Sequence, residues 1–279
     1  MATRFYKGTK PLLSQPSIGG GKLGRVYVGG QLAYGEAPVS TWGTPPSQDA
    51  NCWMFWDASD VNCYPGTGTA ITDLKGNSDG TINGSTWSYE TAAGLGVLRN
   101  SAPKGANYIS AGAYSTVNTG HTFEVWWNSH SDMSGDGVMA EWKGGSTSYQ
   151  TIYEANIQQF ASPARHYVYQ SGESGNPRGG DVIYNDVVAE GEWIHMVVTS
   201  GRNDVNRMYI NGVERDTGDP STETFNSTET WVWDQAGVLF GANNGSKNWI
   251  GQWAVFRGYS VALSAAEVLA NYNFYNAKV

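Results

Sequence analysis

One short stretch combines residue types that could perform acid–base or metal chemistry. "GEWIHMVVTSG" (residues 191–201) contains His195, one of only four histidines in the chain. On a strand, Trp193 and His195 would share one face and Ile194 and Met196 the other. Both faces are largely apolar, which predicts a central strand covered on both sides. No second ligand at metal spacing and no nucleophile motif accompanies the histidine. We therefore expect a buried, neutral His195 that hydrogen-bonds to a backbone carbonyl.

Paired carboxylates are the second chemistry to test. Cleavage of a glycosidic bond needs two carboxylates that flank it, and a strand bearing Glu-x-Asp-x-x-Glu would present them on one face. No such triplet occurs: "TFEVWWNS" offers only Glu124, "MAEWKG" only Glu141, and Glu190 and Glu192 fall at an expected turn. The sequence also lacks G-x-S-x-G, H-E-x-x-H and P-loop motifs. It predicts a protein that is not an enzyme and has no catalytic residues.

Two loops contain acids that could bind calcium. Asp132 and Asp136 lie in "SDMSGDG", and Asp216 and Asp219 lie in "NGVERDTGD". Calcium requires several converging oxygens, and neither cluster completes a known loop pattern. These acids are either a Ca²⁺ site, with Asp132 and Asp136 as the first candidates, or solvated turn residues. No other cofactor is expected.

Tryptophans and asparagines gather in two segments near the C-terminus, "TWVWDQ" and "ANNGSKNW". The candidate sugar-binding residues are Trp231, Trp233, Asn243, Asn244 and Trp249. Aromatic rings beside amides are groups that can hold sugar rings and their hydroxyls. The alternative is that these tryptophans pack between strands, as most of the 12 in the chain must. Both interpretations stay open at the level of the sequence.

The composition indicates strands and turns as the elements that position these residues. The chain has 36 glycines and 16 tyrosines but only 15% charged residues, a mixture that favours strands over helices. From residue 51 onward, short strand-like runs alternate with turn signals. Asn211-Gly212, between two such runs, predicts a two-residue hairpin turn. Helical signal is confined to "LSAAEVLANYNFY", where Ser264 and Glu267 form a capping box.

Residues 1–50 differ from the rest of the chain. They are rich in Pro, Gly and Ser, and "GRVYVGGQLAYG" reads as a short hairpin. They carry five basic residues against two acidic ones, whereas the rest carries 12 against 23. Such a basic arm either docks onto another protein surface or is a solvated tail. The candidate docking residues are Arg4, Lys7, Lys10, Arg25, Tyr27 and Val28.

Charge, hydropathy and cysteine content restrict partners and compartment. An acidic body without clustered Lys and Arg does not favour nucleic acid. No run of 18 apolar residues predicts a membrane span, and the N-terminal residues lack the apolar region of a secretory signal. Cys52 and Cys63 are therefore expected as reduced thiols, although a local disulfide stays open for an exported protein.

Three segments carry a family resemblance. "GEWIHMVVTSGRNDVNRMYINGV" resembles the G-x-W-x-H…Y-[IV]-N-G signature of laminin-G-like, concanavalin-A-like jelly rolls, and "GQWAVFRGYSVALSAAEVLANYN" resembles their closing stretch. The chain departs from the family at "RNSAPKGANYIS", where many members have Phe-Asp-Gly. The resemblance implies an all-β, antiparallel sandwich over residues 51–279, with one short C-terminal helix and an extended arm over residues 1–50. The resemblance also implies a structural role for five residues: Trp193, His195, Tyr209, Asn211 and Gly212.

The third segment, "WDASDVNCYPGTGTAITDLKGNSDGTINGSTW", is similar to openings common in bacteriophage versions of this domain, and "KLGRVYVGGQLAYG" resembles a segment of phage structural proteins. This resemblance implies a virion structural protein, made in the host cytoplasm and displayed on the particle surface as a head decoration, neck or tail component. Its partners would be other virion proteins, bound through residues 1–50, and further copies of itself. The alternative is an adhesin or tail-fibre tip that binds host-surface glycans, and a third hypothesis is a degraded glycosidase.

Overall fold

The structure is a computed structural model. It describes residues 44–45, 49–92, 94–101, 107–112, 120–129, 135–143, 151–159, 164–169, 182–185, 192–201, 207–217, 237–239 and 250–278, together with short strands between residues 17 and 34. Within this part of the chain no helix is long and apolar enough to cross a membrane.

The chain divides into two compact units, Met1–Val39 and Ser40–Val279. The first contains two small antiparallel pairs: β1 (Ser17–Ile18) with β2 (Gly21–Lys22), and β3 (Val26–Val28) with β4 (Gln31–Tyr34). The second pair is the hairpin that the sequence predicts, and Tyr27 and Val28 lie in its first strand. Asp49, at the end of the stretch expected as an arm (residues 1–50), pairs with Lys75 and Arg257 of the second unit.

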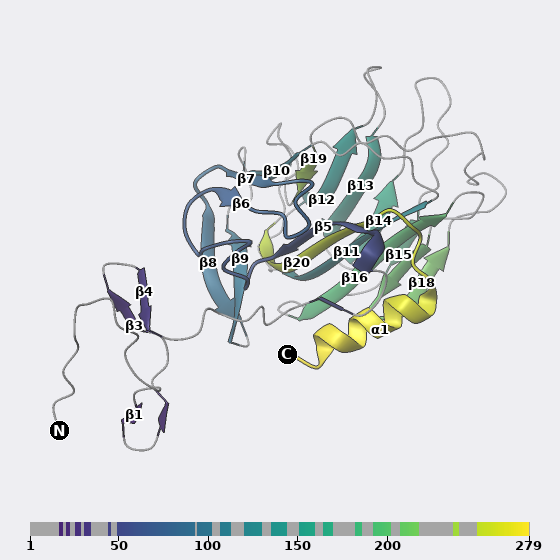
Figure 1. Cartoon of the computed structure of the whole chain (residues 1–279). Helices are drawn as coiled ribbons and strands as arrows, with labels where there is room; N and C mark the ends of the chain where they lie inside the picture. Colours follow the sequence, from purple (N-terminus) through teal and green to yellow (C-terminus); the bar gives the residue numbers. More distant parts are fainter. Residues whose placement is uncertain are drawn as a thin grey trace. The chain divides into compact units, whose positions relative to one another are not determined.

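The second unit contains two large antiparallel sheets (Figure 1). Sheet I has the order β15–β14–β13–β12–β19–β10–β7–β6. Its strands are β6 (Ala70–Ile71), β7 (Gly80–Asn83), β10 (Tyr108–Ala111), β12 (Gly135–Lys143), β13 (Thr151–Gln159), β14 (Ala164–Tyr169), β15 (Val182–Asn185) and β19 (Gly237–Leu239).

Sheet II has the order β18–β17–β16–β11–β20–β9–β8, with β5 also paired to β20. Its strands are β5 (Cys52–Asp57), β8 (Trp87–Ala92), β9 (Leu95–Asn100), β11 (Gly120–Ser129), β16 (Trp193–Gly201), β17 (Arg207–Ile210), β18 (Val213–Thr217) and β20 (Gly251–Tyr259). A 3-10 turn, η1 (Asp49–Asn51), precedes β5, and α1 (Ala265–Asn276) follows β20. The all-β sandwich with one C-terminal helix is as predicted.

The main core lies between the sheets. Sheet I contributes Ile82 and Ile109, and alternate residues of β11 and β16 contribute from sheet II. The buried members from those two strands are Phe123, Val125, Trp127, Ile194, Met196 and Val198. Their spacing by two residues is what a strand with one face on the core requires.

A second apolar cluster covers the opposite face of sheet II. It joins Trp126 and Val197 on the strands to Val268 and Tyr275 of α1, and Figure 1 shows the helix lying along β16 and β18. The strand around His195 is therefore covered on both sides, as predicted. The helix begins as predicted too, because the Ser264 side chain and Glu267 cap each other's backbone N–H groups.

The turn between β17 and β18 is the predicted two-residue hairpin. Asn211 has φ 53° and Gly212 has φ 76°, so both adopt the left-handed conformation of this turn. Asn211 also binds back to β16: its backbone N–H donates to His195 O (2.8 Å), and its Oδ1 accepts from His195 N (2.9 Å). A Cβ on Gly212 would come within 2.9 Å of the Leu269 side chain of α1.

In the "DLKGNS" motif, the buried carboxylate of Asp73 binds four backbone N–H groups. Oδ1 of Asp73 accepts from the backbone N–H groups of Phe55 (2.7 Å) and Lys75 (3.0 Å), and Oδ2 accepts from those of Asn77 and Ser78 (both 2.9 Å). A carboxylate with this many backbone donors orders the connection between β6 and β7. The motif therefore has a structural explanation that does not depend on a ligand.

Both cysteines are free and buried, as the reduced form predicts. The thiol of Cys52 donates to Met54 O (3.1 Å), and the sulfur of Cys63 accepts from Asp57 N (3.3 Å). Burial raises the pKa of both thiols. Neither has the environment of a reactive thiolate.

Candidate functional site

The outer face of sheet II carries a buried polar cluster centred on Glu124. The register places Trp126 opposite His195, and Glu124 two residues along β11 on the same face. Nε2 of His195 lies 2.7 Å from Glu124 Oε1. The Tyr259 hydroxyl donates to Oε2 at 2.5 Å, and Nδ2 of Asn271 in α1 donates to the same oxygen at 3.2 Å.

The electrostatics of this cluster favour an ionised carboxylate. Burial alone would raise the pKa of Glu124, but its hydrogen bond and charge interaction with His195, the Arg257 charge and the Tyr259 hydroxyl together hold that pKa below its usual value. An ionised carboxylate only accepts hydrogen bonds, so Nε2 of His195 carries the proton of their shared bond. Burial and the Glu124 charge raise the pKa of Tyr259 well above its usual value.

This cluster is closed to substrates. Glu124, His195, Tyr259, Asn271 and Tyr275 have no exposed surface, because α1 covers them. His195 is buried as predicted, but the predicted backbone-carbonyl partner is wrong: the partner is the carboxylate of Glu124. From the sequence, Glu124 is only an isolated acid. The pair could be recognised because Glu124 and His195 both lie on apolar strands, where a buried charge needs a partner.

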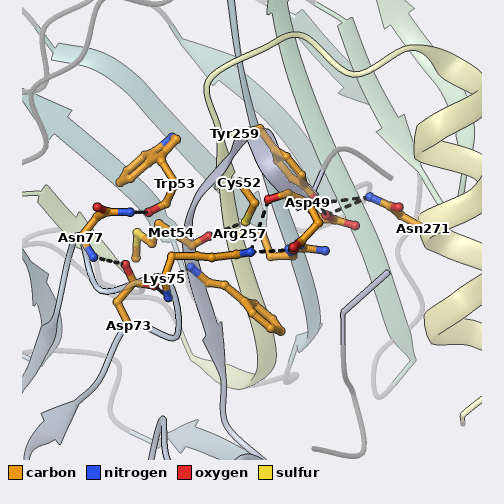
Figure 2. A network of polar contacts seen from close by, with 12 residues as sticks. Asp49, Cys52, Trp53, Met54, Asp73, Lys75, Asn77, Arg257, Tyr259 and Asn271 are labelled. Carbon is orange, nitrogen blue, oxygen red and sulfur yellow. Dashed lines mark hydrogen bonds and ion pairs between the residues drawn. The ribbon is translucent and has the colours of Figure 1, made fainter. Parts of the chain in front are cut away.

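A second polar group lies beside β5 and connects η1 to sheet II (Figure 2). Oδ1 of Asp49 accepts from Lys75 Nζ (2.7 Å) and Arg257 Nη2 (3.1 Å). The guanidinium of Arg257 lies over the rings of Phe55 (4.7 Å) and Tyr259 (5.1 Å). Burial acts to lower the pKa of Arg257, but the surrounding acidic groups outweigh it and raise that pKa. These contacts attach η1, which precedes β5, to sheet II.

The outer face of sheet I differs from this closed face. One row across the sheet comprises Ile82, Ile109, Leu239, Ala140, Ala155, Val168 and Val182. Ile82 and Ile109 belong to the core, so this row lies on the inner face. The next row comprises Thr81, Ser110, Val238, Glu141, Glu154 and Tyr169. Thr81 is exposed and Ser110 half-buried, which assigns this row to the outer face.

Continued along β13 and β14, the same face collects polar and aromatic residue types. Asn156 pairs with Tyr167, and Gln158 pairs with Arg165, without an irregularity between these strands. Both strands were predictable from the sequence, but this face was not. Alternation in "YEANIQQ" and "RHYVY" was the available signal, but only the pairing with β10 shows which alternate set faces outward.

Many predicted site residues lie outside the described residues: Trp231, Trp233, Asn243, Asn244, Trp249, Asp132, Arg4, Lys7, Lys10 and Arg25. Asp136 lies in β12, where it pairs with Gln158. Trp193 is half-buried and stacks on Trp126, with ring centroids 6.3 Å apart. Tyr209 is buried. Among the residues that the structure describes, no group of three or more His, Cys, Asp or Glu could hold a metal ion.

Solved structures with a similar fold include carbohydrate-associated domains. The ligand-binding domain of botulinum neurotoxin D, in complex with N-acetylneuraminic acid, is 12% identical, with a TM-score of 0.58, and the match covers 80% of this chain and 50% of the toxin domain. Domain 4 of the arabinanase AbnA from Geobacillus stearothermophilus, in complex with arabinotriose, is 14% identical, with a TM-score of 0.52 and coverage of 79% and 98%.

The sialidase of Trypanosoma rangeli, in complex with the inhibitor DANA, is 10% identical, with a TM-score of 0.54 and coverage of 78% and 32%. At such identities the likeness establishes the fold alone, and the chain spans about half the length of the toxin domain. No curated protein sequence matches the chain. The model of the concanavalin A-like lectin/glucanase superfamily (Laminin_G_3) matches residues 103–269, so the chain belongs to this family.

Proposed function

We propose that the chain is a non-catalytic carbohydrate-binding module that uses the outer face of sheet I. The observation that carries this proposal is the register of β12, β13 and β14. It brings Glu154, Asn156, Tyr167 and Tyr169 onto one face of adjacent strands, in a domain whose core lies on the other side.

These residue types suit a sugar ligand. A tyrosine ring offers an apolar surface to the C–H groups of a sugar, and its hydroxyl remains polar. Amides donate and accept, and carboxylates accept, which matches the mixed donors and acceptors of sugar hydroxyls. A sheet also holds such groups at fixed spacing, which reduces the entropy lost on binding.

The comparisons support this proposal more than a structural role. Two of the similar structures contain a sugar or an oligosaccharide, and the arabinanase match extends over nearly all of a separate domain. The proposed ligand is therefore a glycan displayed on a surface. A catalytic function would require Glu124 and His195 to reach a substrate. This pair has no exposed surface.

A glycan array with the full chain, followed by calorimetry with the best ligand, tests the proposal. We expect Tyr167→Ala and Tyr169→Ala each to weaken binding about tenfold, since an aromatic contact contributes on the order of 1 kcal/mol beyond area burial. Tyr89→Ala is the matched control, because Tyr89 is a partly exposed tyrosine on β8 of sheet II. Retained affinity in both sheet I variants would contradict the proposed site, and a blank array would contradict the function.

The bacteriophage-like segments favour a second candidate, a virion surface protein anchored by its N-terminal residues. The division of the chain supports this candidate, because Met1–Val39 forms a compact unit that contains the β3–β4 hairpin. Paired strands with a free edge can bind another chain by strand addition. A variant lacking residues 1–39 should then fold but fail to join particles. Normal incorporation of this variant would exclude anchoring by this unit.

A further inference from the structure

A pocket lies at the start of α1, on the opposite sheet from the proposed glycan face. We call it the α1 pocket. Its volume is about 370 Å³, and its lining residues are Thr199, Arg207, Tyr209, Glu214, Ala262, Leu263, Ser264 and Ala265. They come from β16, β17, β18, the connection between β20 and α1, and the first residue of α1. The volume falls at the lower end of the range of small-molecule sites, roughly 300–1,000 Å³.

Thr199 contributes a hydroxyl to the lining of the α1 pocket. The residue as a whole is only 2% exposed, but its hydroxyl is not one of the buried polar atoms that lack a hydrogen-bond partner. In its register partner Thr122, the hydroxyl donates to Val261 O (2.8 Å) and accepts from Leu263 N (2.9 Å). In the pocket, the Thr199 hydroxyl can donate a hydrogen bond to a ligand and accept one from it.

The rim of the pocket is polar but nearly neutral. Arg207 Nη1 lies 3.2 Å from Glu214 Oε1, and each side chain is about one-third exposed (32% and 35%). Their charges cancel. The hydroxyl of Ser264 is already used, because it donates to Glu267 (2.7 Å) within the capping box of α1. The start of the helix is therefore occupied by its own acid and does not favour an anion.

Part of the pocket lining is apolar. Ala262, Leu263 and Ala265 make up this part, and Tyr209 and Thr199 also line the pocket. The pocket thus combines an oppositely charged Arg–Glu pair, a threonine hydroxyl and apolar side chains. Neutral sugars match this combination, since each ring carries hydroxyls that both donate and accept together with patches of C–H groups.

We propose that the α1 pocket binds one neutral sugar residue, as a second site separate from the outer face of sheet I. Glu214 would accept from sugar hydroxyls, Arg207 would donate to them, and the Thr199 hydroxyl could do either. The proposal rests on the proposed carbohydrate-binding function for its ligand class. It adds a second point of attachment, which raises the avidity for a branched or multivalent glycan.

Methyl NMR of the full chain tests this proposal. The probes are D-glucose, D-galactose, D-mannose and L-arabinose, with D-glucuronate as a charged comparison. We expect at least one neutral sugar to shift the methyl signals of Thr199, Ala262 and Ala265 in a saturable manner, with the exposed methyl of Ala70 unchanged. D-glucuronate should bind more weakly than D-glucose, since the pocket carries no net positive charge.

Two variants separate the pocket from general effects. Thr199→Val keeps the shape and removes the hydroxyl, and Glu214→Gln removes the rim acceptor charge without entering the core. Each should weaken sugar binding about tenfold, the fold-change for one lost hydrogen bond of about 1.4 kcal/mol. Glu90→Gln is the matched control, because Glu90 pairs with Arg99 at 3.6 Å with similar exposure (33% and 30%) far from the pocket in the strand order.

The outcomes distinguish this site from the sheet I site. Saturable methyl shifts that persist in Tyr169→Ala but weaken in Glu214→Gln support the α1 pocket, whatever the glycan array shows. Array binding that is lost in Tyr169→Ala, together with no saturable shift at Thr199, Ala262 or Ala265, overturns the α1 pocket and leaves the proposed function standing. Unchanged affinity in both Thr199→Val and Glu214→Gln also overturns it.

Discussion

The two outer faces of the sandwich use polar residues in opposite ways. On sheet II, Glu124, His195 and Tyr259 meet beneath α1 with no exposed surface. On sheet I, the register places Glu154 and Tyr169 in one row with Thr81, which is exposed. The difference teaches that residue type alone does not identify a functional site. The histidine and the glutamate with the most suggestive chemistry are buried partners, whereas ordinary tyrosines and amides form the proposed binding surface.

The largest effect should come from removing the centre of the buried cluster. Glu124→Ala leaves the Nε2–H of His195, the Tyr259 hydroxyl and the Asn271 amide without their acceptor, so we expect about 3–5 kcal/mol of destabilisation. Urea unfolding at pH 7 measures it. His195→Gln keeps a donor and rough volume and should cost about 1–2 kcal/mol. If Glu124→Ala were as stable as the wild type, the cluster would not hold α1 on the sheet.

Acid should destabilise the sandwich through two buried groups of β11. Burial lowers the pKa of His121 from 6.5 to about 3. The unfolded chain therefore binds a proton that the folded chain excludes, and stability falls as the pH drops from about 6.5 toward 3, by at most about 1.4 kcal/mol per pH unit. Glu124 acts in the same direction at lower pH, because its lowered pKa stabilises the fold above its unfolded pKa, near 4.5, and this contribution is lost as the pH falls through the folded value.

His121→Gln separates the two groups. Unfolding of this variant, followed between pH 7 and pH 4, should show a shallower loss of stability than the wild type, whereas Glu124→Gln should change the profile mainly below pH 4.5. Parallel profiles for the wild type and His121→Gln would show that the histidine does not titrate on unfolding as described.

An intermediate effect is expected at the turn that contacts α1. Gly212→Val places a β-branched residue at φ 76° and brings its Cβ within 2.9 Å of Leu269. We expect about 2 kcal/mol of destabilisation, from backbone strain and the displaced helix contact. Thermal unfolding measures it, with Gly94→Val as a control for strain alone, because Gly94 has φ 79° and no atom within 4 Å of its Cβ position. Equal losses in both variants would mean that the helix contact contributes nothing.

The smallest effect on stability should accompany the largest effect on binding. Our proposal places Tyr167 and Tyr169 on the outer face of sheet I. Replacing either with alanine should therefore change the free energy of unfolding by about 0.5 kcal/mol or less. Calorimetry of folded variants then reports on the ligand alone. A loss of several kcal/mol would place these tyrosines in packing and remove the contrast between the two faces.

Local features of the fold were predictable from the sequence, and long-range ones were not. The Asn211-Gly212 turn, the Ser264–Glu267 cap and the two-sided strand around His195 depend on residues within a few positions of each other, and each agrees with the prediction. The partner of His195 lies 71 positions away, so no local pattern reveals it. The ion pair of Asp49 with Arg257 likewise joins residues 208 positions apart.

The sequence by itself determined the elements: which segments alternate as strands, where the hairpin turns, where the helix begins, and that the domain is an antiparallel sandwich. These follow from side-chain periodicity and from backbone preferences that each residue carries with it. Only the tertiary structure decided which polar residues are closed from solvent. Strand pairing and the packing of α1 bring distant residues together, and burial then makes Glu124 and His195 a structural pair.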